Sequence, residues 1–368
     1  GANLLEPGAT PYENAQFLLF LAAVIKSVDE YQDLLRISVA SAGNDHRLGA
    51  NEAPPAIVSM FLGTDLSEIL DAIVNDTAYD SKEKEIMRIG VHTLPKFPKD
   101  TTDRNRTSPF AFTGNKFEFR MLGSASSISC ANTVLNTAVA ETLKEFADYL
   151  EGKDDFEKAL HDLIKDTIKA HKRIIFNGDG YDDKWVKEAE SRGLLNLKTT
   201  PEALTHLLDE KNIKLFESHK VYSKAELTAR YEVLNENYGK VINIEALTML
   251  DMARKDILPA MSEFAKKLSK SALEKKEFVA DVDLTYEKET VKKLGDMTKE
   301  AYKHVLKLEE DLSAAKDITS APEYAMYCKD KILPDMAALR ISVDSAEAIA
   351  SKKDWPYPSY GELLFGVR

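Results

Sequence analysis

Apolar residues at helical spacing dominate the chain from residue 131 to its end. They recur every three or four positions in the stretches 131–151, 155–176, 201–216, 223–269, 286–315 and 321–350. Such spacing places the apolar side chains on one face of a helix. Ser223 followed by Glu226, and Thr200 followed by Pro201, are typical helix starts. The pattern therefore predicts a mainly α-helical bundle of long antiparallel helices over residues 131–368.

The first 130 residues mix helical and strand-like patterns. Residues 12–35 are apolar nearly all round, as expected of a packed helix. The stretch that starts at Arg36 begins with the alternation of a strand, and 56–63 has the apolar run of a second strand. Residues 1–130 are therefore predicted to form an α+β part, and the chain as a whole to be mostly helical.

Two segments interrupt these regular patterns. Residues 43–55, between the two predicted strands, are rich in glycine and end in a double proline, so a loop is predicted there. The tail 354–368 is rich in aromatic residues and proline, and we expect it to lie across a surface or a neighbouring subunit instead of continuing a helix. Residues 65–76 return to an amphipathic helical pattern, with Asp65 or Ser67 available as its cap.

The charge balance of the chain narrows the classes of partner. Forty-nine lysine and arginine residues against 61 aspartate and glutamate residues leave a net charge of −12. A negative field disfavours nucleic acids and anionic membranes, so neither is predicted as a partner. No apolar run reaches the roughly 20 residues that span a bilayer. The two cysteines, Cys130 and Cys328, have no metal-like spacing, and the absence of a disulfide framework predicts a cytoplasmic location.

The segment 116-KFEFR-120 is the first candidate for chemistry. In a strand, Lys116, Glu118 and Arg120 share one face, and the two phenylalanines share the other. One interpretation is the solvated outer face of an edge strand. The other is a site for a phosphate or carboxylate together with a metal ion. A carboxylate oxygen suits Mg²⁺, and neighbouring cations neutralise phosphoryl oxygens.

Two loops upstream of this segment carry further candidates. Arg104 and Arg106 lie in a turn-rich stretch, where planar guanidinium groups suit phosphate recognition. Arg47 and Glu52 lie in the glycine-flanked loop 43–55, which could bring a carboxylate over a site and exclude water from it. From either loop alone, solvated side chains on a plain connection explain the pattern as well.

Two other polar features are given no catalytic role. A lone histidine in a polar loop, His46, is explained by solvation or local hydrogen bonds. Residues 177–185 collect acidic residues and glycines but depart from the EF-hand calcium loop, because Asp182 stands where its invariant glycine belongs. Asn-Gly followed by Asp-Gly predicts a turn there instead.

The residues of two of these motifs, and their order in the chain, resemble those of a known family. The stretches 46-HRLGANEAPPAI-57 and 105-NRTSPFAFTGNKFEFR-120 resemble the C-terminal half of the catalytic domain of type III glutamine synthetases. The motifs cover about residues 12–150, and the helical remainder is similar to the C-terminal helical region of these enzymes. The resemblance implies ATP-dependent ligation of ammonia to glutamate, which gives glutamine through a γ-glutamyl phosphate.

The resemblance also implies roles for the loop residues. Glu52 matches the flap glutamate that closes the site and takes a proton from ammonium. Arg47 matches the arginine near the glutamate substrate and its phosphorylated carboxylate, and Arg106 matches the arginine that stabilises the transferring phosphoryl group.

For the strand, the resemblance implies contacts with ATP, metal and substrate. Lys116 stands where bacterial type I enzymes carry an arginine near the ATP phosphate. Glu118 matches a metal-ligand glutamate, and Arg120 matches the arginine that holds the carboxylate of the substrate. Mg²⁺ or Mn²⁺ is the implied cofactor, ATP the co-substrate, and a homo-oligomer of stacked rings, a dodecamer as in the family, the implied assembly. Phosphoryl transfer asks mainly for positioning and charge neutralisation, which explains several cations around one carboxylate.

Two departures from the family pattern limit these expectations. Ala111 stands where type I enzymes carry a further arginine, so another cation must replace it or that contact is absent. The other metal ligands and the N-terminal β-grasp domain of the family lie upstream of these motifs. One glutamate cannot hold a divalent ion that needs several ligands. The chain is therefore expected to be the C-terminal part of a longer enzyme and to be inactive alone.

The alternative is a protein of a different class, a non-catalytic homologue that acts as an assembly or regulatory scaffold. A scaffold needs none of the matched site residues, namely Glu52, Arg106, Glu118 and Arg120. Their presence favours the enzyme.

Overall fold

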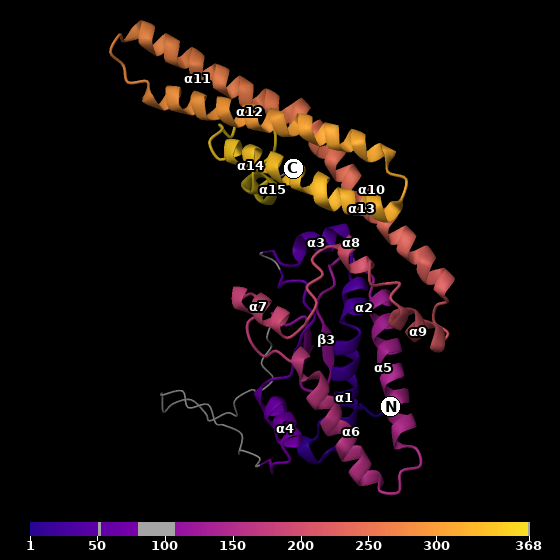
Figure 1. The fold of residues 1–368 in the computed structure, drawn as a ribbon. Coiled ribbons are helices and arrows are strands. Elements are labelled where there is room, and N and C mark those ends of the chain that lie inside the picture. The colour runs from indigo at the N-terminus through magenta and orange to yellow at the C-terminus, as the bar shows by residue number, and fades with distance from the viewer. Residues whose placement is uncertain (51–52, 80–106, 367–368) are drawn as a thin grey trace, which may run out of the picture. The chain divides into compact units, whose positions relative to one another are not determined.

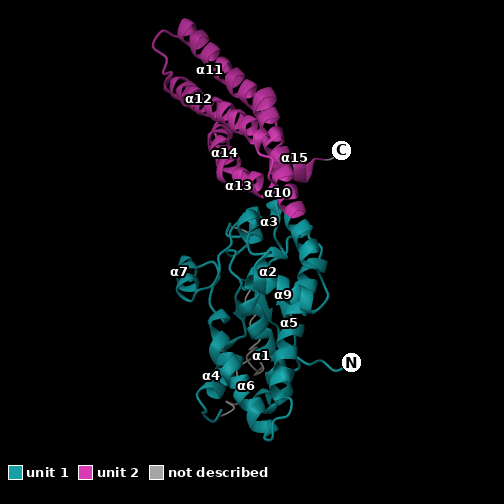
Figure 2. Cartoon of the chain, turned by 45° about the vertical axis from the view of Figure 1, so that its right-hand side comes forward, with its two compact units in different colours: residues 1–231 teal, residues 232–368 magenta. Residues whose placement is uncertain are grey.

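The computed structural model describes residues 1–50, 53–79 and 107–366. The chain divides into two compact units, residues 1–231 and residues 232–368 (Figures 1 and 2). The predicted boundary at residue 130 falls inside the first unit, at the start of a long helix, and stays a prediction. None of the helices in the described ranges is both long enough and apolar enough to cross a membrane.

The first unit combines helices with a small sheet. Its helices are α1 (Ala15–Glu30), α2 (Gln32–Ile37), α3 (Ala42–Arg47), α4 (Thr64–Val74), α5 (Ser129–Leu150), α6 (Phe156–His171), α7 (Asp183–Ser191), α8 (Thr200–Leu204), α9 (Glu210–Ser218) and the start of α10 (Lys224–Met252). Short 3-10 turns cover Pro11–Glu13 and Lys172–Ile174. The strands are β1 (Met60–Phe61), β2 (Phe110–Phe112) and β3 (Phe117–Phe119).

The sheet and helix α1 form the core of the first unit. The strand order is β1-β2-β3, with β1 parallel to β2 and β2 antiparallel to β3. Helix α1 contacts α5 and α6, and its Phe17 ring lies 6.0 Å from the ring of Phe112 in β2. Leu21 and Ile25 are fully buried. The predicted packed helix is confirmed, because α1 is surrounded by apolar partners.

The strand predicted to start at Arg36 is wrong. Residues 32–37 form α2, and turn hydrogen bonds follow from Val39 N–H to Arg36 and from Ala40 N–H to Ile37. All six residues of α2 are buried. Because Gln32, Asp33 and Arg36 are buried together with the apolar residues, polarity does not follow exposure in this short helix, and its sequence does not reveal a helical period.

Two local predictions in the next segment also need correction. The predicted loop 43–55 begins with a helix, α3, whose N-cap Ser41 accepts a hydrogen bond from Asn44 N–H at 3.2 Å. The N-cap of α4 is Gly63, at φ 84°, and it makes no side-chain cap bond, so neither Asp65 nor Ser67 fills that role. The second apolar strand is confirmed, although it is only two residues long.

The second unit is a helical bundle, as predicted. It contains the rest of α10, then α11 (Leu258–Phe278), α12 (Thr285–Ala314), α13 (Ala321–Tyr327), α14 (Leu333–Glu347) and α15 (Tyr360–Phe365), with a 3-10 turn at Ala315–Asp317. The long helix α12 packs against α11 and α14, and α11 and α12 form an antiparallel hairpin (Figure 1).

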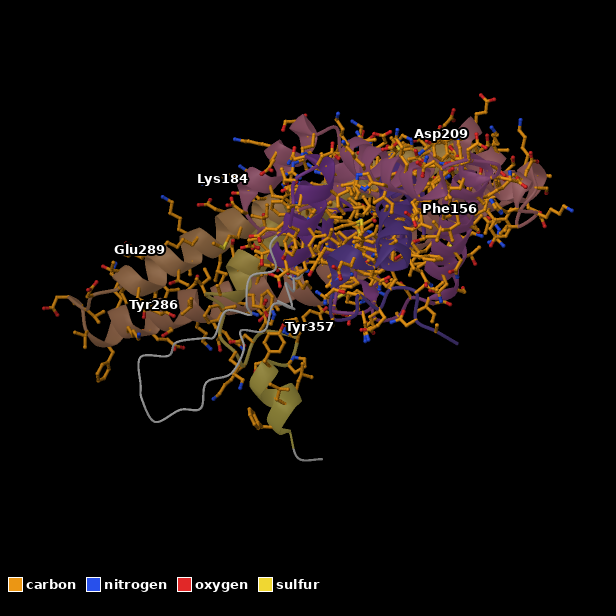
Figure 3. All side chains as sticks on the ribbon, turned by 90° about the horizontal axis from the view of Figure 1, so that it is seen from below. Phe156, Lys184, Asp209, Tyr286, Glu289 and Tyr357 are labelled. Carbon is orange, nitrogen blue, oxygen red and sulfur yellow. The ribbon has the colours of Figure 1, made fainter. Side chains whose placement is uncertain are left out.

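The C-terminal tail packs on the second unit. Helix α14 ends at Glu347, and Trp355 and Tyr357 pack against the buried cluster Ile257, Met261, Phe264, Leu294 and Ala346. Tyr357 is labelled in Figure 3. Its hydroxyl donates to Asp256 Oδ2 at 3.1 Å. The tail thus leaves α14, as predicted, and the rings of Trp355 and Tyr357 cover the bundle core, whereas Tyr360 and Phe365 of α15 are exposed.

Two prolines lie inside long helices of this unit. Pro259 and Pro334 are each preceded by a π-helical turn, Ala253–Ile257 and Cys328–Ile332. Proline lacks an N–H group, and its ring collides with the carbonyl four residues earlier. A π turn widens the helix at that point and lets it continue. The continuous helical patterns predicted across both prolines are therefore confirmed.

A glycine in α10 makes room for an aromatic ring. A Cβ atom on Gly239 would lie 2.4 Å from Cδ1 of Tyr324 in α13. A Cβ atom on Gly295 in α12 would meet nothing within 4 Å. We predict that Gly239→Ala lowers the free energy of unfolding by about 1–3 kcal/mol, because the overpacked ring must move.

The matched control is Gly295→Ala, which we expect to raise the same free energy by about 0.5–1 kcal/mol through helix propensity. Urea unfolding of both variants and the wild type tests the pair. Equal effects of the two substitutions would contradict the tight contact with Tyr324.

Two carboxyl groups share a site between α12 and α14. Asp311 is 6% exposed and accepts hydrogen bonds at Oδ1 from Lys307 Nζ at 2.8 Å and from the Tyr327 hydroxyl at 3.4 Å. Asp335 Oδ2 is buried without a hydrogen-bond partner among the described residues. Burial, and then the neighbouring Asp311, raises the pKa of Asp335 to about 6. The hydrogen bond from Asp335 lowers the pKa of Asp311. Below about pH 6 the two groups are therefore expected to share one proton.

The raised pKa of Asp335 contributes stability below its unfolded value, and that contribution is lost as the pH rises through about 6. The lowered pKa of Asp311 acts in the opposite sense at lower pH. Asp335→Asn keeps a neutral donor in place. We predict that the free energy of unfolding of this variant, relative to that of the wild type, increases by about 1 kcal/mol from pH 5 to pH 8, after allowance for solvent screening.

Thermal unfolding at the two pH values measures this gain. The control is Asp344→Asn, which removes an exposed partner of Arg340 and should shift stability equally at both pH values. A difference between Asp335→Asn and wild type that does not change with pH would exclude the shared proton.

Candidate functional site

A hairpin formed by β2 and β3 presents the strand residues singled out in the sequence. Its turn closes through a hydrogen bond from Thr113 N–H to the Lys116 carbonyl at 2.8 Å, with Gly114 at φ 94°. The rings of Phe117 and Phe119 lie 5.1 and 5.8 Å from the ring of Phe110. The phenylalanine face therefore packs on the core, as the alternation predicts.

The opposite face of β3 carries an ion pair. Arg120 donates from Nε at 3.2 Å and from Nη2 at 2.8 Å to Oε2 of Glu118. The Glu118 side chain is 42% exposed, and that of Arg120 is 23% exposed. The hydrogen bond from Arg120, with a further contribution from the charge of exposed Lys116, lowers the pKa of Glu118. Glu118 is therefore held as a carboxylate, the form that binds cations.

Arg47 lies next to the end of this strand. It is the last residue of α3, and its Nη2 donates to the carbonyl of Met121 at 2.7 Å. Its Nε donates to Asn44 Oδ1 at 3.1 Å. The guanidinium of Arg47 thus binds the backbone of the residue that follows Arg120, although the two arginines are far apart in the sequence.

Asn44 is a structural link that sequence reasoning missed. It is 3% exposed, and its Nδ2 donates to the carbonyls of Val39 at 2.8 Å and Met121 at 3.0 Å. Its oxygen orients Arg47. Its place three residues before Arg47, on the same face of a helix, could have signalled this pairing once a helix was assigned there.

The segment that follows Ile175 supports the hairpin side of the site. Asn177 Oδ1 accepts from the N–H groups of Leu62 at 3.0 Å and Gly63 at 3.1 Å. Gly180 N–H donates to Thr107 Oγ1 at 2.8 Å. The predicted turn, residues 177–180, therefore connects the end of β1 to the segment that leads into β2, and we call it the brace. Helix α7 follows it, with Asp182 as a side-chain cap.

The remaining predicted site residues, Glu52, Arg104 and Arg106, lie outside the described residues. Ala111, where the resemblance leaves a contact open, is buried in β2 opposite Glu118.

The described residues supply only part of a divalent metal site. Glu118 offers one carboxylate, whereas Mg²⁺ takes about six oxygen ligands. In the described part of the chain, the one cluster with metal-ligand spacing is Asp33, His206 and Asp209, away from β3. Lys211 Nζ already lies 2.9 Å from the Asp33 carboxylate, and His206 Nδ1 lies 2.9 Å from Asp209 Oδ2. Glu118 therefore fits one ligand position, and the described residues complete no metal site around it.

Comparison of the sequence with those of known proteins indicates the family. Residues 159–276 match the model of the glutamine synthetase C-terminal domain. The whole chain aligns with a glutamine synthetase from Butyrivibrio fibrisolvens at 45% identity, covering 100% of this chain and 53% of the relative. The chain belongs to the glutamine synthetase family. The resemblance inferred from the two motifs is thereby confirmed.

Other glutamine synthetases align over similar lengths. A type-3 glutamine synthetase from Dictyostelium discoideum is 43% identical over 99% of this chain and 51% of its own length. A glutamine synthetase from Bacteroides fragilis is 37% identical over 99% of this chain and 52% of its own length. The chain thus spans about half the length of the curated relatives it matches.

The close packing of the brace leaves no room for a side chain at Gly180. A Cβ atom there would lie 2.6 Å from the Thr107 carbonyl oxygen and 3.3 Å from Pro54 Cβ. Because the first contact is with backbone, we predict that Gly180→Ala lowers the unfolding free energy by about 1–3 kcal/mol.

Gly43 is a suitable control, because a Cβ atom there meets nothing within 4 Å. Gly43→Ala should leave stability unchanged or raise it by a few tenths of a kcal/mol, roughly the value of a better helix former. Chemical denaturation of both variants decides. An unchanged midpoint for Gly180→Ala would exclude the close packing against Thr107.

Proposed function

We propose that this chain forms part of the active site of a glutamate–ammonia ligase that couples ATP cleavage to glutamine formation through a γ-glutamyl phosphate. Family membership supports the reaction class. The observation that carries the proposal is the joint placement of Arg47, Glu118 and Arg120 around the end of β3.

The two arginines are proposed to bind glutamate. A guanidinium offers a planar pair of N–H donors that matches a carboxylate. Arg120 would hold the carboxylate of the substrate, and Arg47 would lie near the side-chain carboxylate that is phosphorylated. Arg47 is oriented by Asn44 and Met121, so it needs little rearrangement to bind.

Lys116 and Arg106 are proposed to neutralise the phosphate oxygens. Lys116 is exposed at the start of β3 and lies close enough to Glu118 to lower its pKa. Arg106 precedes Thr107, the residue braced by Gly180. Charge neutralisation and positioning are the main requirements of phosphoryl transfer.

Glu118 and Glu52 are assigned the acidic roles. Glu118 would contribute one ligand to Mg²⁺ or Mn²⁺, which supplies further charge neutralisation when bound. Glu52, three residues before Pro55 in a loop rich in glycine and proline, would take a proton from ammonium. We also propose a cytoplasmic homo-oligomer of stacked rings, a dodecamer, in line with the family.

The role of Glu118 gives a direct test. In the protein at its natural full length, Glu118→Gln should lower glutamine formation by about 10²-fold and raise the Mg²⁺ concentration needed for half-maximal rate. The reason is the loss of a charged metal ligand from the site.

Glu188→Gln is the matched control, because Glu188 forms an ion pair with Arg192 at a similar exposure, 46% and 29%. It should leave the rate unchanged. Glutamine formation by Glu118→Gln at the wild-type rate would exclude the metal role. A full-length wild type without ligase activity would favour the non-catalytic scaffold.

A further inference from the structure

A buried ion pair beside α3 has no part in the proposed chemistry. Arg36 in α2 is 1% exposed, and its Nη2 lies 2.7 Å from Oδ1 of Asp45 in α3. The other carboxylate oxygen, Oδ2, accepts a hydrogen bond from Thr200 N–H at 2.6 Å. Burial raises the pKa of Asp45, while Arg36 and Thr200 oppose the rise. Both carboxylate oxygens of Asp45 are therefore committed to fixed donors.

The same pair joins three segments of the first unit. Arg36 also donates from Nε to the Leu197 carbonyl at 2.7 Å and from Nη2 to the Lys198 carbonyl at 3.2 Å. Residues 197–200 belong to the matched C-terminal domain, whereas α2 and α3 precede it by more than a hundred residues. The C-terminal domain thus supplies backbone groups that hold α2 and α3.

Helix α3 depends on such anchors. It has six residues, and isolated helices shorter than roughly 12 residues are not stable in water. Its neighbouring residues Asn44 and Asp45 fix it on two sides. Asn44 binds Val39 and Met121, and Asp45 binds Arg36 and Thr200. Loss of one anchor leaves the helix free to rotate about the other.

Arg47 lies two residues after Asp45, at the end of the same helix. We propose that Asp45 is a positioning residue, which fixes α3 between Arg36 and the Thr200 N–H group and thereby orients Arg47 toward the glutamate substrate. This inference rests on the proposed function for the identity of the substrate, but the ordering of α3 does not.

A purely stabilising role would not require this arrangement. A buried ion pair adds little net stability compared with well-packed apolar residues of the same size. Directional bonds from Asp45 to Arg36 and Thr200, in contrast, define the register of a short helix. A substitution of Asp45 should therefore affect the orientation of Arg47, at the end of α3, more than it affects the stability of the fold.

The first test variant is Asp45→Asn, which keeps the shape of the side chain. Its amide NH₂ group is a donor, so it cannot accept the hydrogen bond from either Arg36 or the Thr200 N–H group, and one of these two donors loses its partner. The second is Thr200→Pro, which removes the N–H group together with the Thr200 hydroxyl and leaves both charges. Proline suits this position, because Thr200 opens α8 and Thr199 before it is extended, at φ −118° and ψ 155°.

Asp29→Asn is the matched control. Asp29 in α1 is 3% exposed and accepts from His171 Nδ1 and Arg173 Nε, both at 2.8 Å. It is therefore another buried carboxylate with cationic partners, but its contacts do not involve α3. It reports what the loss of such a carboxylate does to stability alone.

Two readouts are needed, both in the protein at its natural full length. The first is amide hydrogen exchange of residues 42–47, which does not depend on activity. Asp45→Asn and Thr200→Pro should exchange there about 10-fold faster than wild type, with α1 unchanged. The second is steady-state kinetics, in which KM for glutamate should rise about 10-fold while KM for ATP stays constant.

The outcomes separate the inference from the proposed function. Unchanged exchange in α3 in both variants would overturn the positioning role, and so would faster exchange with an unchanged KM for glutamate. Equal effects of Asp29→Asn on KM would reduce the role to general stability and overturn it as well. A wild type that makes no glutamine would refute the proposed function, while hydrogen exchange would still decide whether Asp45 orders α3.

Discussion

The buried guanidinium of Arg36 is the constraint on which the arrangement of the first unit depends. It binds Asp45 and the carbonyls of Leu197 and Lys198 from a position that water does not reach. A charge in such a place is costly unless each donor has a partner, and Nη1 has none among the described residues. Separating the segments that bind it would leave a buried charge without partners, so these hydrogen bonds hold α2, α3 and residues 197–200 together.

The geometry of the candidate site follows from that body and from the hairpin beside it. Met121 follows β3, and its carbonyl accepts hydrogen bonds from both Asn44 and Arg47. The face of β3 that carries Glu118 and Arg120 is therefore set against α3 by backbone as well as side chains. Cations outnumber carboxylates there although the whole chain is acidic. This local reversal of charge suits a site for anionic substrates, with a single carboxylate left for a metal ion.

The second unit depends on helices that continue past residues which would otherwise interrupt them. Two prolines would break them, and a π turn before each one lets the helix continue. Gly239 admits the ring of Tyr324 between α10 and α13. Between α12 and α14, burial and the neighbouring Asp311 raise the pKa of Asp335 to about 6.

Helical periodicity and strand alternation by themselves determined the helical bundle, the packed helix α1 and the two faces of β3, because burial on one side leaves a period in the sequence. The two motifs were sufficient to indicate the family. The sequence could not show that residues 32–37 and 42–47 are helical, since six residues make fewer than two helical turns and are too few to reveal a period. Only the tertiary structure decided that Asp45, Arg36 and Thr200 meet. Hydrogen bonds between residues more than 150 positions apart depend on how the chain folds back, and local patterns do not record that.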